Sequence, residues 1–144
     1  MSNTIYKITP PHALQASITL PPSKSISNRA LIINALAGSR VMPENLSDCD
    51  DTQVLFNALT LRPPVIDIKA AGTAMRFMTA YLAVTQGEHF ITGTKRMKQR
   101  PIGVLVDALC KLGAHIDYEG KQGFPPLRIK GTYLPGGRLD IAGD

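Results

Sequence analysis

The chain has 144 residues and a mass of 15.6 kDa, which suffices for one compact domain and excludes a large multidomain assembly. Apolar residues make up 44% and charged residues 19%, a composition that predicts a packed core rather than disorder. Sixteen Lys and Arg against 11 Asp and Glu give a net charge of +5, which favours anionic partners without distinguishing metabolites, nucleic acid and lipid.

Apolar runs separated by Gly and Pro indicate alternating strands and helices. Helices are expected where apolar residues recur every three or four positions, and strands in the shorter runs between them. The alternation predicts an α/β or α+β fold. In chain order, the pattern predicts a strand at 17–20, helices at 27–37 and 50–59, a strand at 66–69, a helix at 73–84, a strand at 89–92, a helix at 101–112, and strands at 115–118, 127–130 and 138–141.

Two of the predicted helices, 27–37 and 73–84, are apolar around almost their whole circumference. Such helices are expected in the interior, whereas the other two carry polar residues on one side and are expected to cover a sheet or lie at the surface.

Residues 54–59, VLFNAL, are similar in sequence to residues 104–109, VLVDAL. This similarity suggests a repeat, although Leu and Ala are common helix formers and chance similarity is the alternative.

Cys49 and Cys110 lie far apart without CxxC or metal-ligand spacing, which predicts a reducing, cytoplasmic location. No leader pattern or long apolar stretch is present, so we expect neither export nor insertion into a membrane.

Other motifs carry less information about function. Helix capping explains the acidic run at 48–51 better than a metal does, and no metal site is expected. His12, His89 and His115 are scattered, with no recognisable nucleophile nearby. Neither a Walker A nor a GxGxxG motif is present.

The start of a helix is its positive end, so acidic residues are favoured there and each cation costs about 0.3–1 kcal/mol. The helix at 50–59 follows this rule, because Asp50 and Asp51 occupy its first turn and Ser47-x-x-Asp50 resembles a capping box. The other three helices do the opposite. Lys24 and Arg29 bracket the first helix start, Arg76 lies in the first turn of the third, and Arg100 precedes Pro101, the predicted first residue of the fourth.

A bound anion would compensate these cations, because it is held by both the side chains and the free N–H groups of the helix start. The sequence therefore predicts an anion site. A nucleic-acid surface or a solvated loop could also explain the cations at 95–101. However, the chain has no Trp and no aromatic residue lies among these cations, which argues against nucleic acid.

Together, three segments resemble the signatures of the 5-enolpyruvylshikimate-3-phosphate (EPSP) synthase family, the 3-phosphoshikimate 1-carboxyvinyltransferases. They are LPPSKSISNRAL at 20–31, AGTAMR at 71–76 and RMKQRPIG at 96–103. The resemblance covers essentially the whole chain but only about the first third of a usual member.

The resemblance implies transfer of the carboxyvinyl group of phosphoenolpyruvate to the 5-hydroxyl of shikimate 3-phosphate, with release of phosphate, in the shikimate pathway to chorismate and the aromatic amino acids. It implies no cofactor and no membrane or nucleic-acid partner. It also implies two similar domains made of βαβαββ units with buried helices under sheets, and substrates bound between them. Residues 1–144 would form an incomplete first domain of about two units.

By resemblance, Lys24 contacts both substrates, and Ser25 and Arg29 hold shikimate 3-phosphate. Gly72 and Arg100 hold phosphoenolpyruvate. Thr73 and Arg76 match the motif and are expected to shape the site.

Two positions depart from the family pattern. Phe77 stands where the family often has Pro, and Ala70 replaces a frequent Asn, which leaves the local loop geometry open. The family's Ser-Ser-Gln segment is expected beyond Gly143-Asp144, and its general base belongs to the second domain, which this chain lacks. No catalytic residue is therefore assigned, and the chain is expected to be a truncated enzyme that is inactive alone.

Two alternatives stay open. UDP-N-acetylglucosamine enolpyruvyl transferase shares the fold and the phosphoenolpyruvate chemistry, but its usual Lys-Asn pair is Lys24-Ser25 here and no Cys lies at 95–101. A basic nucleic-acid-binding module would use the same charge for contacts with the phosphate backbone.

Overall fold

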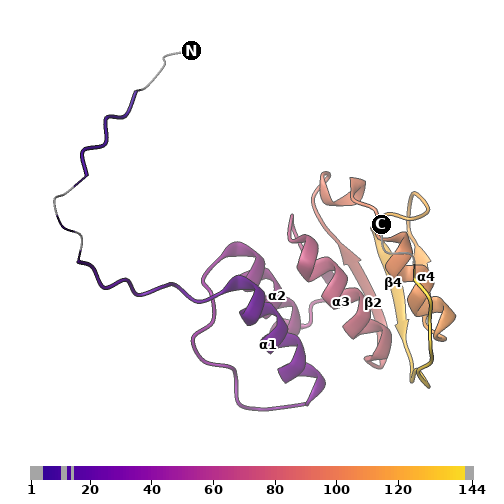
Figure 1. Ribbon diagram of the computed structural model, residues 1–144. Coiled ribbons are helices and arrows are strands. Elements are labelled where there is room, and N and C mark those ends of the chain that lie inside the picture. Colours follow the sequence, from indigo (N-terminus) through magenta and orange to yellow (C-terminus); the bar gives the residue numbers. More distant parts are fainter. Residues whose placement is uncertain (1–4, 11–12, 14, 142–144) are drawn as a thin grey trace.

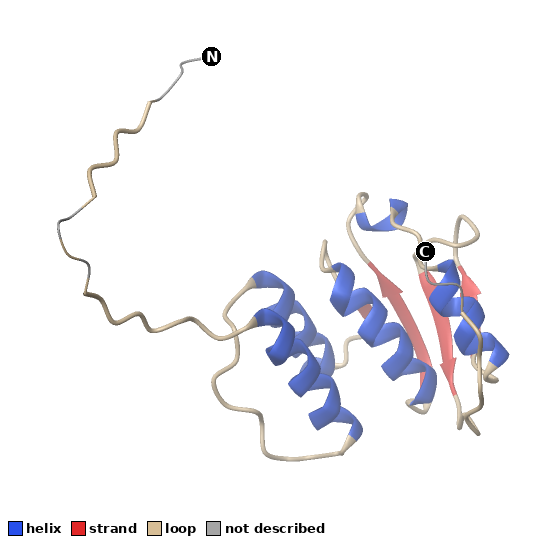
Figure 2. Ribbon diagram, viewed as in Figure 1, coloured by secondary structure: helices blue, strands red, loops and turns tan. Residues whose placement is uncertain are grey.

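The computed structural model describes residues 5–10, 13 and 15–141. Two helices come first along the chain, followed by a region in which strands and helices alternate (Figures 1 and 2). The elements are α1 (Lys24–Leu36), α2 (Asp50–Leu61), β1 (Val65–Asp67), α3 (Gly72–Val84), β2 (Gly87–Thr92), the 3-10 turn η1 (Met97–Gln99), α4 (Gly103–Lys111), β3 (His115–Tyr118) and β4 (Leu127–Gly131).

The strands form one four-stranded sheet in the order β1-β2-β4-β3. β1 and β2 are parallel and are connected through α3, whereas β4 is antiparallel to both β2 and β3. Ile91 of β2 pairs with Ile66 on one side and with Leu127 on the other. From β1 to β4 the chain therefore forms one βαβαββ unit, which confirms the predicted mixed α/β fold class.

One face of the sheet is buried under α3. Met75 and Met78 of α3 belong to the same buried cluster as Ile91, Leu127 and Ile129 of the sheet. Side chains alternate between the two faces of a strand, so the opposite face carries exposed charged residues. These are Glu88, Asp117, Arg128 and Lys130. The structure confirms the prediction that the helix at 73–84 is buried.

The same prediction is wrong for the helix at 27–37. The helix begins at Lys24, and it packs against α2 and α3 through one side only, where Leu31 is buried. On its other side, Ile26 and Ile33 are 71% and 66% exposed. An apolar circumference shows that a helix can be buried, but neighbouring elements decide whether it is.

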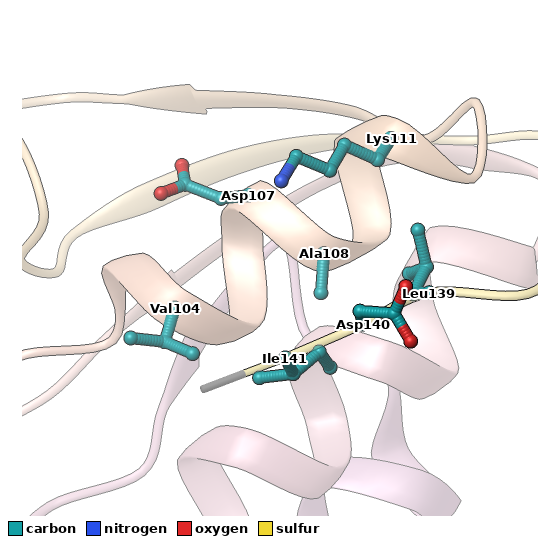
Figure 3. Close-up of a pocket in the computed structure, with 7 residues that line it drawn as sticks. All are labelled: Val104, Asp107, Ala108, Lys111, Leu139, Asp140 and Ile141. Atoms are coloured by element: carbon teal, nitrogen blue, oxygen red, sulfur yellow. The ribbon is translucent and has the colours of Figure 1, made fainter. Parts of the chain in front are cut away.

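Two predicted strands do not form. Residues 17–20 and 138–141 are both described, and neither segment belongs to the sheet. The alternating pattern is present at 17–20, but Ile18 and Leu20 are 79% and 80% exposed. An extended segment becomes a strand only when a neighbour accepts its hydrogen bonds. Residues 139–141 instead lie beside α4 (Figure 3).

The remaining boundaries shift by a few residues. β1 ends at Asp67 rather than at 69, because Lys69 takes a left-handed backbone conformation with φ of 53°. α4 begins at Gly103, so Pro101 is not its first residue.

Residues 54–59 and 104–109 both lie in helices, but only the second segment has a strand both before and after it. The repeat and the count of two units stay predictions.

Candidate anion-binding site

The first turns of α1, α2 and α3 lie at the same end of the molecule (Figure 1). Lys24 Nζ lies 3.2 Å from Asp51 Oδ2, which joins the starts of α1 and α2. The Arg29 guanidinium carbon lies 5.7 Å from the centre of the Phe77 ring, which joins α1 to α3. The unpaired N–H groups of each helix start carry partial positive charge. The starts of α1 and α3 therefore favour an anion even without their cationic side chains, whereas Asp50 and Asp51 occupy the start of α2.

Buried polar groups hold α1 against α2 near these starts. Thr52 Oγ1 donates to Asn28 Oδ1 at 2.9 Å, and the Ser47 backbone N–H donates to Ser27 Oγ at 2.9 Å. These bonds orient the turn of α1 that carries Lys24 and Ser25. Sequence reasoning did not single out Asn28 or Thr52, because an isolated polar residue in a helix carries no signal of its partner.

The predicted capping box at Ser47 is wrong. Cys49 is the N-cap residue of α2, and no side chain caps this helix. Ser47 Oγ instead accepts a hydrogen bond from the Cys49 N–H at 3.3 Å. Hydrogen bonding with the Ser47 and Thr52 side chains lowers the pKa of the Cys49 thiol.

A second part of the site lies beyond the carboxyl ends of β1 and β2. The Ile68 N–H donates to Thr92 O at 2.9 Å, and the Thr94 N–H donates to Lys69 O at 2.9 Å. These bonds hold together the segment that leads to Gly72 and the one that leads to Arg100. In sheets with parallel strands, ligands commonly bind beyond the carboxyl ends.

The Arg100 guanidinium lies directly on Gly72, the first residue of α3. A Cβ atom added at Gly72 would lie 2.6 Å from Arg100 Cζ and 2.7 Å from Nη2, so no larger residue fits while Arg100 keeps this position. Arg100 follows η1 and sits three residues before α4 begins. The sequence pattern places Arg100 at the start of the fourth helix. In the structure its side chain instead lies against Gly72, at the start of α3.

Arg76 connects the same two segments. Its Nη2 donates to Pro101 O at 2.9 Å and its Nη1 to Gly72 O at 3.2 Å. Both acceptors are backbone carbonyls, so Arg76 holds the segment that carries Arg100 against α3. Thr73, the second residue of α3, is exposed.

The predicted residues thus fall into two groups. Gly72, Arg76 and Arg100 form one, and Lys24, Ser25 and Arg29 form the other on α1, where Arg29 Nη1 donates to Ser25 O at 3.0 Å. Phe77 links the two groups through Arg29. Sequence reasoning noted Phe77 only as a departure from a pattern, since nothing local to it indicates a contact with a helix nearly 50 residues earlier.

The cations of the site differ in their partners. Within the described parts of the chain, ion pairs join Lys24 to Asp51, Lys69 to Asp67 and Arg128 to Glu119. No ion pair there involves Arg29, Arg76 or Arg100, so the charge of these three guanidinium groups is not neutralised by a carboxylate.

Most of the pockets are lined by none of the predicted site residues. The one between α4 and residues 139–141 (Figure 3) is lined by none of the predicted residues. A groove of about 460 Å³ begins at Arg76 and Pro101 and follows α4. The two groups therefore form an open surface rather than an enclosed cavity.

Over residues 5–10, 13 and 15–141, no group of three or more His, Cys, Asp or Glu side chains is arranged to hold a metal ion. His12 lies outside the described residues. None of the described helices is both long enough and apolar enough to span a bilayer.

Asp67 supports the turn that leads into the site. Its Oδ1 accepts from the Lys69 backbone N–H at 2.9 Å, and its Oδ2 lies 2.6 Å from Lys69 Nζ. Hydrogen bonding from Lys69 lowers the pKa of Asp67 below its ordinary value of 3.8. The charged carboxylate therefore stabilises the left-handed conformation of Lys69.

We expect Asp67→Asn to lower the melting temperature at pH 7 by a small amount, because a half-exposed pair contributes less than about 1 kcal/mol. A depressed pKa contributes stability above the unfolded pKa and loses it as the pH falls through the folded pKa. The melting temperatures of the two proteins should therefore converge as the pH falls below the ordinary pKa of 3.8 and through the lowered pKa of the folded protein. Thermal unfolding between pH 2 and pH 7 measures this, and a constant gap would contradict it.

A family model and several known proteins match this chain over most of its length. A family model described as EPSP synthase (3-phosphoshikimate 1-carboxyvinyltransferase) matches residues 8–62 and 58–144. A 3-phosphoshikimate 1-carboxyvinyltransferase from Bacteroides fragilis is 60% identical over 139 residues, which cover 96% of this chain and 34% of the relative. One from Vibrio cholerae is 40% identical over 162 residues, covering 94% of this chain and 38% of the relative.

A solved structure of EPSP synthase from Acinetobacter baumannii superposes with a TM-score of 0.73 and 22% identity, covering 86% of this chain and 34% of that structure. This likeness supports the fold. The chain spans about a third of the length of the curated relatives that it matches.

Proposed function

Because the chain belongs to the EPSP synthase family, we propose that it supplies part of the substrate site of an enzyme that transfers a carboxyvinyl group. The donor is phosphoenolpyruvate, the acceptor is the 5-hydroxyl of shikimate 3-phosphate, and phosphate is released. The observation that carries this proposal is the gathering of un-neutralised guanidinium groups, from all three family motifs, at the end where three helices begin.

The chemistry of the reaction requires such a surface. Each substrate carries a phosphate group with a charge of about −1.5 to −2 at neutral pH, and a carboxylate as well. Two polyanions must therefore be brought together against their repulsion. Fixed cations and N–H donors reduce that repulsion and stabilise the charge that shifts as a tetrahedral adduct forms.

We assign the roles residue by residue. Arg29 and Ser25 bind shikimate 3-phosphate, Gly72 and Arg100 bind phosphoenolpyruvate, and Lys24 contacts both. Thr73 and Arg76 shape the site, and the two carbonyl bonds of Arg76 support that role. The Lys24–Asp51 pair implies that substrate competes with Asp51 for the ammonium group. A cytoplasmic location stays a prediction from the cysteine content.

Isothermal titration of this chain with shikimate 3-phosphate and with phosphoenolpyruvate, separately and together, tests the proposal. We expect Arg29→Ala to weaken binding of shikimate 3-phosphate at least tenfold, since a charge-assisted hydrogen bond contributes about 1.5–3 kcal/mol. Lys130→Ala, which removes the same charge from the outer face of the sheet, is the matched control and should leave affinity unchanged.

Two outcomes would overturn the proposal. If the chain binds neither metabolite, the site assignment fails. If Lys130→Ala weakens binding as much as Arg29→Ala and the affinity collapses with salt, the cations form a general polyanion surface, as in a nucleic-acid-binding module.

A further inference from the structure

Arg29 and Phe77 occupy equivalent positions on neighbouring helices. Each is the sixth residue of its helix, Arg29 in α1 and Phe77 in α3. The two helices pack against each other with their starts at the same end. The Phe77 ring is half-buried, and the Arg29 guanidinium carbon lies 5.7 Å from its centre. This distance is within the range at which an aromatic face attracts a cation.

An aromatic ring restrains a guanidinium differently from a carboxylate. A carboxylate would neutralise the charge and occupy the N–H donors along the guanidinium edge, as Asp51 does for the ammonium group of Lys24. A ring attracts the flat face, so the edge donors and the charge stay available for a phosphate. Of the five N–H donors of an arginine, the structure records one bond, from Arg29 Nη1 to Ser25 O.

We propose that Phe77 is a positioning residue for Arg29. Its ring holds the exposed Arg29 side chain beside the second turn of α3, so that less side-chain freedom is lost when shikimate 3-phosphate binds. Arg76, immediately before Phe77, is bonded to Pro101 O. The same turn of α3 therefore orients Arg29 and supports the segment that carries Arg100. The inference rests on the proposed role of Arg29 in substrate binding.

Substitutions at Phe77 separate the ring's attraction from its bulk. Phe77→Leu keeps an apolar side chain but removes the aromatic face, whereas Phe77→Tyr keeps it. In titration calorimetry we expect Phe77→Leu to weaken binding of shikimate 3-phosphate about 2- to 5-fold, and Phe77→Tyr to bind like the wild type. In an Arg29→Ala background, Phe77→Leu should have no further effect.

Phe90 provides a matched control. It lies on the sheet, and the Arg128 guanidinium carbon is 5.8 Å from its ring centre, so Phe90→Leu removes a similar contact away from the site. This variant should leave binding unchanged. If Phe77→Leu has no effect, if Phe77→Tyr is as weak as Phe77→Leu, or if the loss persists without Arg29, the inference is overturned.

A ligand-free measurement distinguishes failure of this inference from failure of the proposed function. In NMR spectra of the chain alone, the Arg29 side-chain protons should carry a ring-current shift that Phe77→Leu removes. If the chain binds shikimate 3-phosphate but the shift is absent, the role of Phe77 is wrong and the function stands. If the shift is present but no metabolite binds, the proposed function is wrong. The role of Phe77 in positioning Arg29 for substrate is then wrong as well.

Discussion

Replacing Gly131 by alanine is expected to destabilise the fold by about 3 kcal/mol or more, at the upper end of the range for overpacking. Gly131 ends β4 where that strand approaches the last turn of α3. A Cβ atom there would overlap the Thr85 carbonyl and lie 2.8 Å from Leu82 O. Both are backbone atoms, and the Thr132 N–H bonds to Ala83 O at 2.9 Å in the same place. Neither segment can move away without breaking such bonds.

Urea unfolding followed by circular dichroism measures this effect. Gly120→Ala is the control, because its Cβ would meet only Pro126 Cδ at 3.7 Å, an ordinary contact. The control should change the free energy of unfolding by less than about 0.5 kcal/mol. Equal stabilities for the two variants would show that β4 and α3 are not packed as closely as described.

Replacing Gly72 by alanine is expected to weaken binding of phosphoenolpyruvate at least tenfold without destabilising the fold. The new methyl group would occupy the position of the Arg100 guanidinium. That side chain is exposed and flexible, so it moves aside and loses charge-assisted hydrogen bonds of about 1.5–3 kcal/mol. The nearest atoms that the methyl group would meet all belong to the end of this one flexible side chain and none to the backbone, so the fold itself is not strained.

Gly103→Ala is the matched control, because Gly103 is also the first residue of its helix. A Cβ atom there would lie 3.5 Å from Gly123 Cα, an ordinary contact. Calorimetry should show unchanged phosphoenolpyruvate binding for Gly103→Ala, and unchanged shikimate 3-phosphate binding at Arg29 for Gly72→Ala. If Gly72→Ala binds phosphoenolpyruvate like the wild type, the role proposed for Arg100 is wrong.

Several elements could be predicted because their signals are local. Alternation of apolar residues marks β3 and β4, where Leu127 and Ile129 face the core and Arg128 faces solvent. The almost wholly apolar circumference of α3 matches its burial under the sheet. Cations at helix starts were recognisable because the charge preference of a helix end is a property of the backbone itself.

Other features depend on partners that are distant along the chain. The stacking of Arg100 on Gly72, the contact of Arg29 with Phe77 and the pairing of Lys24 with Asp51 each join residues at least 27 positions apart. Residue type indicates that each side chain can bind an anion or pack against a neighbour. The packing of α1 against α2 and α3 brings the Lys24 and Arg29 pairs together. The backbone bonds between the segments that follow β1 and β2 bring Arg100 to Gly72.

The errors have the same origin. Residues 17–20 have the pattern of a strand and α1 has the composition of a buried helix, yet Ile18 and Ile33 are exposed. Periodicity reports which side of a segment is apolar, a property set by adjacent side chains. Burial and strand pairing also require a second surface, and its position follows from the arrangement of the whole chain.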